Sequence, residues 1–294
     1  MRYLILLLVI ATPARAELVE RSQWVMGTEL RIIVADGATA ELFEDCFAIA
    51  RDCERVLSRW DPEAELAQLN AAAGSKTEVS GELFAWLQRV ARDHTRTRGA
   101  FDPTVGTWIL DPESDIEIGM DRVKLGPGRH VRLPAGFALD SGGDGKGVAV
   151  DLIVTRLREA GVEALVSFGG SSTYGVGDGP EGEGWRLGVA DVEGNWIGNV
   201  ALTDAGLSVS HSVQVDQLAD GRNEIRPHIF DPSTGDLVTE ARTAVVWSES
   251  ATDAEVLSTA LIVRGDLELL SEFPGAKGLV TPSSAEFPDW IRQD

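Results

Sequence analysis

Residues 140–151 read Asp-Ser-Gly-Gly-Asp-Gly-Lys-Gly-Val-Ala-Val-Asp, and the rest of the chain is organised around this stretch. An apolar approach over 137–139 precedes it and an amphipathic run follows it, so the pattern predicts a strand, a glycine loop and a helix. Such a loop can hold a phosphate, because glycines admit an anion close to the backbone, a helix N-terminus offers free N–H groups, and Lys146 adds a positive charge. The spacing matches no standard nucleotide fingerprint, so a plain glycine turn before a packed helix stays open as the alternative.

The N-terminus has the features of an export signal. An apolar run over 4–10 follows Arg2 and leads to Ala14-Arg15-Ala16, which fits an Ala-x-Ala cleavage site. The run is shorter than the roughly 20 residues that span a bilayer. We therefore expect residues 1–16 to be a signal peptide and residues 17–294 to form one exported domain. This domain should be soluble after cleavage, without a membrane span, and periplasmic where the cell has an outer membrane.

The composition restricts the possible partners. There are 47 acidic residues against 26 Lys and Arg, which gives a formal net charge of -21, and a surface this acidic repels nucleic acid and anionic membranes. An anionic ligand would need local positive charge or a metal. Cys46 and Cys53 are seven positions apart on a predicted helix, about 10 Å along its axis, which is too far for a disulfide. We expect them to be core thiols.

The hydrophobic pattern predicts a mixture of strands and helices. Alternation indicates strands over 18–34 with a break at 26–28, then 164–168, 185–190, 200–202, a hairpin of 208–216 with 226–230, and 243–247. Helical spacing indicates helices over 39–60, from Ser80 to Gly99, and over 252–264. A short helix or turn over 63–70 and a loop-rich segment over 111–134 complete the chain. This order is typical of an α/β or α+β protein.

Histidine and serine offer two candidate sites. Ser210 and His211 are neighbours on a predicted strand, so their side chains point to opposite faces, and no nucleophile elbow is present; a serine hydrolase is therefore disfavoured. His228 and Asp231 precede a turn made by Pro232 and Gly235, which would present both groups at a strand end. Most histidines followed by aspartate are ordinary surface turn residues, so the residues alone favour that explanation of this second pattern. His94 is expected to be a satisfied, partly buried residue.

The last predicted helix offers a possible metal site. Glu255 and Thr259 are four residues apart, so a carboxylate and a hydroxyl share one face and can bind a hard cation such as Mg²⁺. The alternative is a capping box over 252–255, in which Glu255 reaches back to the Thr252 N–H and Asp253 suits the helix dipole. The residues alone favour the cap.

Seven short sequence blocks follow one another along the chain. They are Met26-Gly27-Thr28, Ser58-Arg59-Trp60-Asp61-Pro62, Ala100-Phe101-Asp102-Pro103-Thr104-Val105-Gly106, residues 140–151, Gly169-Gly170, residues 228–235 and residues 258–265. Blocks of this kind occur in this order in FAD:protein FMN transferases, the ApbE family of flavin transferases, and the chain resembles this family over nearly all of its predicted mature length.

The resemblance implies a single mixed-sheet domain of the ApbE type with a Mg²⁺-dependent transferase activity. Such an enzyme binds FAD as a substrate, attaches its FMN half through a phosphoester to a threonine of an exported acceptor flavoprotein, and releases AMP. The implied acceptors are flavin-carrying subunits of redox complexes. The alternatives of another class are an FAD-binding carrier without transferase activity and a metal-dependent FAD pyrophosphatase that yields FMN and AMP.

The same resemblance implies the roles of individual residues. His228 would be the base or charge stabiliser, with Asp102 as the second catalytic residue. The implied Mg²⁺ ligands are the Gly143 carbonyl, Glu255, which stands where the family usually has aspartate, and Thr259. The family's usual Thr-Ser-Gly block appears here as Ser208-Val209-Ser210. The FAD-binding positions are Met26, Trp60, Ala100, Phe101, Asp102, Asp140, Lys146, His228 and Ile229.

Overall fold

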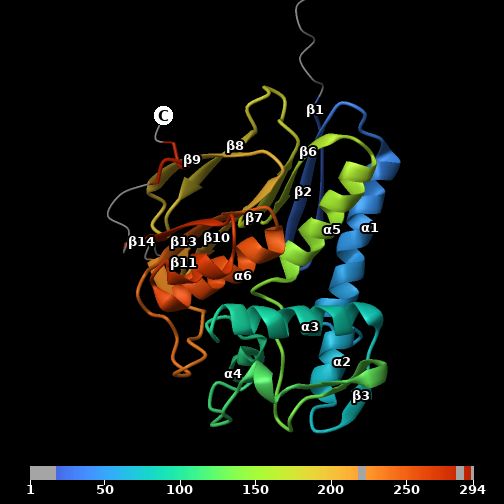
Figure 1. Ribbon diagram of the computed structural model, residues 1–294, viewed down its shortest axis with the longest axis vertical. Helices are drawn as coiled ribbons and strands as arrows, with labels where there is room; N and C mark the ends of the chain where they lie inside the picture. The colour runs from blue at the N-terminus through green and yellow to red at the C-terminus, as the bar shows by residue number, and fades with distance from the viewer. Residues whose placement is uncertain (1–17, 218–222, 283–287, 293–294) are drawn as a thin grey trace, which may run out of the picture.

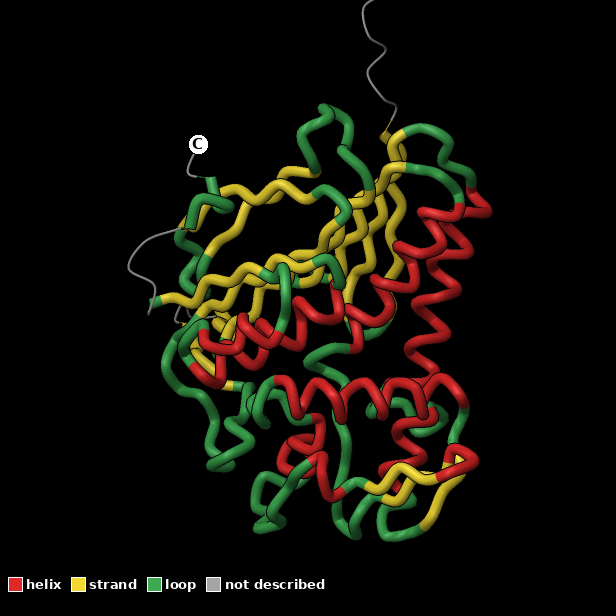
Figure 2. The backbone as a smooth tube through the Cα atoms, in the orientation of Figure 1, coloured by secondary structure: helices red, strands yellow, loops and turns green. Residues whose placement is uncertain are grey.

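The computed structural model describes residues 18–217, 223–282 and 288–292, and the predicted signal peptide lies outside this part. A large sheet with helices against it fills the upper half in Figure 1, and a helical layer with a small sheet fills the lower half. Figure 2 shows the same division, with most strands above and the transverse helix between the halves. In the described part, no helix is both long and apolar enough to span a membrane.

A seven-stranded sheet forms the centre of the upper half, and each of its neighbouring pairs is antiparallel. An antiparallel sheet with helices gathered on one face is an α+β arrangement, which confirms the predicted fold class. The strands in spatial order are β1 (Leu18–Val25), β2 (Thr28–Ala35), β6 (Glu163–Phe168), β7 (Ser172–Val176), β10 (Ala205–His211), β13 (Thr243–Ser248) and β14 (Lys277–Thr281).

Three helices cover one face of this sheet: α1 (Ala40–Leu57), α5 (Gly145–Glu159) and α6 (Ala251–Arg264). Phe43 and Phe47 of α1 and Ile153 of α5 pack with the inward side chains of β2 and β6 in one buried cluster. The hairpin of β8 (Trp185–Ala190) and β9 (Trp196–Leu202) belongs to a second cluster with Leu207 and Val245. Apolar burial on both faces therefore fixes the sheet.

The lower half is organised around α3 (Gly81–Arg96). As expected, the Ser80 hydroxyl caps it by accepting from the Leu83 N–H, and its apolar face packs in the largest buried cluster, which also includes residues of α6. The other elements here are α2 (Glu65–Ala71), α4 (Gly106–Leu110), β3 (Lys76–Glu78), β4 (Lys124–Gly126), β5 (His130–Arg132) and the 3-10 turns η1 (Pro103–Val105), η2 (Met120–Arg122) and η3 (Pro127–Arg129).

Most of the predicted elements are present. The predicted hairpin of 208–216 with 226–230 is only partly right: β11 (Val213–Gln217) pairs with β12 (Asn223–Pro227), whereas residues 208–211 belong to β10 of the large sheet. Its turn lies outside the described residues. The 3-10 turn η4 (Glu268–Glu272) follows α6. Cys46 and Cys53 are buried free thiols, as expected, and burial raises the pKa of each to about 11.

The strand predicted over 137–139 is wrong. This segment belongs to no strand, and side chains and a distant carbonyl rather than a neighbouring strand satisfy its backbone. The Leu139 N–H donates to Asn70 Oδ1 at 2.8 Å, the Ala138 N–H donates to Thr107 Oγ1 at 3.0 Å, and the Asp140 N–H donates to the Pro103 carbonyl at 2.8 Å. These contacts hold the glycine loop against α2 and α4 instead of against the sheet.

Candidate active site

A cavity of about 610 Å³ opens where the two halves meet. Three segments that are far apart in the sequence line it: the turn between β1 and β2 with Met26, the end of α1 with Trp60, and the glycine loop from Asp140 to Lys146. Of the nine residues that the resemblance assigned to FAD binding, Met26, Trp60, Asp140 and Lys146 line this cavity. The other five are not part of its lining: Ala100, Phe101, Asp102, His228 and Ile229.

The glycine loop is anchored at both ends. The Ser141 hydroxyl donates to the Leu57 carbonyl at the end of α1 at 2.7 Å, and the Gly145 N–H donates to the Ser141 carbonyl at 2.8 Å. Asp140 Oδ2 accepts from the Gly142 N–H at 3.0 Å. These bonds place the N-terminus of α5, with Lys146 in its first turn, at the wall of the cavity.

Glu255 lies beneath that helix start. Its carboxylate is buried, accepts from the Gly147 N–H at 2.6 Å, and takes a second hydrogen bond from the Ser172 hydroxyl. Lys146 Nζ is 3.5 Å from Glu255 Oε1. Glu255 therefore caps α5 from a different helix and neutralises part of the Lys146 charge.

The predicted capping box at the start of α6 is wrong. The helix begins at Ala251, one residue before the predicted start, and the Ser250 hydroxyl caps it by accepting from the Asp253 N–H at 3.2 Å. Asp151 of α5 supplies a second cap, accepting from the Ala251 N–H at 2.8 Å. Glu255 is one turn too far along the helix to serve this end.

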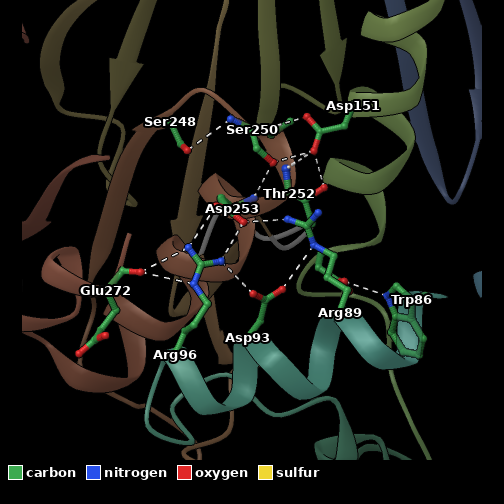
Figure 3. A network of polar contacts seen from close by, with 12 residues as sticks. Trp86, Arg89, Asp93, Arg96, Asp151, Ser248, Ser250, Thr252, Asp253 and Glu272 are labelled. Atoms are coloured by element: carbon green, nitrogen blue, oxygen red, sulfur yellow. Dashed lines mark hydrogen bonds and ion pairs between the residues drawn. The ribbon is translucent and has the colours of Figure 1, made fainter. Parts of the chain in front are cut away.

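Asp253 points toward α3, as Figure 3 shows. Its Oδ1 accepts from Arg89 Nη2 at 2.8 Å and from Arg96 Nη1 at 3.3 Å. Arg96 Nη1 also bonds Asp93 at 3.0 Å, and burial raises the pKa of the Asp93 carboxyl above its usual value. Asp253 is therefore committed to holding α3 against α6, which leaves Glu255 as the carboxylate nearer the loop.

Gly143 is the residue at which the glycine loop comes close to α6. A Cβ atom built at this glycine would be 3.0 Å from Phe101 Cε2 and 3.5 Å from Thr259 Oγ1, so its backbone passes close to both side chains. The Thr259 hydroxyl is half-buried and makes no hydrogen bond within the described part of the chain. The structure thus brings together the Gly143 and Thr259 positions that the sequence assigned to a metal.

Asp144 follows Gly143 and is fully buried. Its Oδ2 accepts from Trp86 Nε1 at 2.8 Å, and Oδ1 has no hydrogen-bond partner within the described residues. Burial raises the pKa of the Asp144 carboxyl well above its usual range. The carboxyl sits behind the loop and ties it to α3.

Asp102 is buried beside Phe101 and holds a turn. Its carboxylate accepts from the Thr104 N–H at 2.8 Å and from the Met120 N–H at 3.1 Å. His94 Nδ1 is 3.2 Å from Asp102 Oδ2, and this hydrogen bond raises the pKa of His94. His94 is thus the satisfied, partly buried residue expected. Asp102 shapes the backbone of residues 100–104, which carries Ala100 and Phe101.

His228 directly follows β12. Its N–H donates to the Ser212 carbonyl at 3.3 Å, while the next residue, Ile229, packs on the large lower cluster. His228 is exposed, yet the surrounding protein removes enough water from the imidazole to lower its pKa. His211 is near enough to affect it: burial lowers the pKa of His211 and the His228 charge lowers it further.

A family model described as the ApbE family matches residues 26–276. The chain belongs to the ApbE family. Among relatives, this ApbE-family chain is 29% identical over 319 residues to the FAD:protein FMN transferase of Treponema pallidum, covering 94% of this chain and 86% of that protein. It is 25% identical to the FAD:protein FMN transferase of Chlamydia muridarum, covering 71% of each.

A solved structure shares the ApbE fold. The crystal structure of the ApbE protein of Thermotoga maritima superposes with a TM-score of 0.77 at 23% identity, covering 90% of this chain and 94% of that one. At this identity the likeness shows the fold.

Sequence reasoning missed two groups of this ApbE-family site. Arg59 lines the cavity between Ser58 and Trp60, and Glu54 lines it while accepting from the Met26 N–H at 2.8 Å. Arg59 lies within a block that the sequence analysis quoted, but only the fold shows that its side chain turns inward. Glu54 is one of several charged residues on the amphipathic helix α1, so nothing in the local sequence indicates that it lines the cavity.

Proposed function

We propose that this chain is an FAD:protein FMN transferase. The observation that carries the proposal is the cavity in which the N-terminus of α5 and Lys146 face Met26 and Trp60. A helix start and a lysine suit a pyrophosphate, and an exposed indole suits a planar ring. The relatives at 29% and 25% identity that carry this enzyme name support the assignment.

The residues at the loop fit a hard divalent cation. Gly143 and Thr259 approach each other, and Glu255 stands one turn before Thr259, so a carbonyl, a hydroxyl and a carboxylate occur near the loop. Glu255 would have to bind the cation in addition to its bonds from Gly147 and Ser172. Within the described residues no three His, Cys, Asp or Glu side chains form a metal cluster, so phosphate oxygens would have to complete the coordination. Mg²⁺ is bound in this way by few protein ligands plus substrate phosphates. When bound, it would neutralise charge on the pyrophosphate.

We assign the proton transfer to His228. In the reaction, the threonine hydroxyl oxygen bonds to the FMN phosphorus while the pyrophosphate P–O bond breaks and AMP leaves with its phosphate oxygen. The hydroxyl proton passes to the His228 imidazole, which is neutral near pH 7 because its pKa is lowered. Lys146 would bind the pyrophosphate, and Asp102 would act by holding the backbone that carries Phe101 beside Gly143.

The direct test uses the mature protein with FAD, Mg²⁺ and an acceptor domain that carries a threonine. The expected result is an acceptor mass increase of one FMN unit with one AMP released per label. AMP without labelling would replace the proposal by an FAD pyrophosphatase, and tight FAD binding with neither product would replace it by a carrier. Thr259→Val should impair transfer more than Thr95→Val, an exposed threonine on α3, if the metal assignment holds.

We also propose that the protein works outside the cytoplasm on an exported acceptor flavoprotein of the redox-complex type. The support is the signal-like sequence over residues 1–16. Cell fractionation with sequencing of the mature N-terminus tests this proposal. A mature protein that starts at Glu17 in the exported fraction is expected, and full-length protein confined to the cytoplasm would contradict it.

A further inference from the structure

Arg59 is a cation with an unusual environment at the cavity wall. Its side chain is only 10% exposed, and its Nε contacts Asp140 Oδ1 as an ion pair. That contact does not have hydrogen-bond geometry, and both Nε and Nη1 are buried without a hydrogen-bond partner in the described part of the chain. Burying guanidinium donors without partners is unfavourable, so another interaction must offset the loss.

The compensating contact is the indole of Trp60. The Arg59 Cζ atom lies 3.7 Å from the centroid of the Trp60 ring, which is a close cation–π stack. The Ser58 hydroxyl accepts from the N–H groups of Trp60 and Asp61 at 3.2 and 3.1 Å, so the backbone turn that carries the indole is also fixed. Arg59 therefore covers one face of the indole from the protein side.

The other face of Trp60 is left open. The residue is 76% exposed although it lines a cavity, so the side of the indole away from Arg59 is accessible. A planar ring could stack only on this free face, forming a layered stack of guanidinium, indole and ligand ring. Arg59 also contacts Asp140 across the cavity wall, so it links the indole to the start of the glycine loop.

We propose that Arg59 is a positioning residue of the dinucleotide site. It holds the Trp60 indole and the Asp140 carboxylate in the arrangement that receives a planar aromatic ring, which the proposed substrate FAD carries at both ends. The inference deepens the proposed function and rests on it for the identity of the ligand. It concerns binding and not transfer, so it can be tested without acceptor turnover.

The test measures the affinities of FAD, FMN and ADP by fluorescence or calorimetric titration. Arg59→Met should weaken FAD binding by about tenfold, the loss expected for a cation–π contact at a desolvated site. The single-ring ligand that also loses affinity identifies which ring stacks on Trp60. Arg59→Lys should recover part of the loss, because an ammonium keeps the charge but not the flat stacking surface. Arg55→Met, at an exposed arginine in the last turn of α1, is the matched control.

A double-mutant cycle separates positioning from general destabilisation. If Arg59 acts through the indole, Arg59→Met should cost little further affinity in a Trp60→Ala background, because the ring platform is already lost. Additive losses, or wild-type FAD affinity in Arg59→Met, would overturn the inference. If Arg59→Met unfolds, Arg59→Lys in the same cycle carries the test. FAD binding by the wild type without FMN transfer would refute the proposed function and leave this inference standing.

Discussion

The N-termini of α5 and α6 are each capped by a carboxylate from the other helix. Only the N-terminus of α6 has its N–H groups bonded by several protein side-chain oxygens, whereas the loop before α5 lines the cavity. At α6, Asp151 accepts from the N–H groups of Ala251 and Thr252 and from the Thr252 hydroxyl, at 2.6–3.1 Å, and Ser250 adds its own cap. At α5, Glu255 takes the Gly147 N–H, while the preceding loop residues line the cavity.

This difference shows how one fold uses the same electrostatic feature in two ways. The positive end of a helix dipole is stabilised by any nearby anion. At α6 the protein supplies the anion and the end is structural. At α5 the Glu255 carboxylate accepts from the N–H of Gly147, the third residue of the helix. The glycines of the preceding loop leave room for an external phosphate to approach its backbone. The following predictions test this distinction, from the largest expected effect to the smallest.

Removing the charge of Glu255 should have the largest effect. Glu255→Gln leaves Lys146 without its partner and weakens the donor set for a cation, so we expect FMN transfer to fall by about 100-fold. The free energy of unfolding should fall by about 2 kcal/mol, less than for a fully enclosed pair, because Lys146 is partly exposed. Transfer rates and urea denaturation measure both. Glu268→Gln, on an exposed residue, should change neither.

Gly147 sets the distance between the two helices. A Cβ atom there would be 2.7 Å from Thr252 Cα and 2.8 Å from the Ala251 carbonyl oxygen, and backbone atoms cannot turn aside. Gly147→Ala should therefore lower the free energy of unfolding by about 2 kcal/mol. In the control Gly81→Ala, the new methyl meets no atom within 4 Å. Equal stability of the two variants would show that the helices are not in contact at this glycine.

Replacing Asp151 should lower the stability of the protein and leave its affinity for FAD unchanged. Asp151→Asn keeps the shape of the cap but removes its charge, so the free energy of unfolding should fall by about 1 kcal/mol. The affinity for FAD should stay at the wild-type value, because Asp151 and Thr252 line a different cavity from the one proposed for FAD. Denaturation and FAD titration of the same sample check both parts. If Asp151→Asn weakens FAD binding at unchanged stability, the start of α6 binds the ligand and the distinction between the two helix starts is wrong.

The pH dependence of transfer should be the smallest signal. The pKa of His228 is lowered, so the neutral base persists below the ordinary value of about 6.5, and the acid limb of kcat/KM should have its midpoint below that pH. The limb should flatten in His228→Asn. His211 has a lowered pKa too, so His211→Asn is the control that must retain it. If the acid limb disappears in His211→Asn and persists in His228→Asn, His211 and not His228 is the base.

Local signals in the sequence predicted much of the fold. The stripe of apolar residues predicted α1, and the hydroxyl of Ser80 marked the start of α3, because both depend on residues within one turn. The glycines and Lys146 likewise predicted the loop and helix that line the cavity. Periodicity and caps are short-range properties, so they can be read without the tertiary structure.

The predictions that were wrong concern residues whose hydrogen-bond partners lie far away in the sequence. Residues 137–139 have the composition of a strand, but the side chains of Asn70 and Thr107 take their backbone bonds. Glu255 has the spacing of a local cap and instead caps α5, 108 residues away from its partner Gly147 in sequence. No pattern within a helix can reveal a carboxylate that serves another helix.

The structure of the protein with FAD and Mg²⁺ bound tests the central claim most directly. The account predicts the pyrophosphate against residues 142–146 at the start of α5, with an aromatic ring on the free face of Trp60. A second cavity of about 670 Å³, between α1, α3 and α5 and lined by Cys53 and Leu152, is the rival location. FAD bound there, with the glycine loop untouched, would contradict the account.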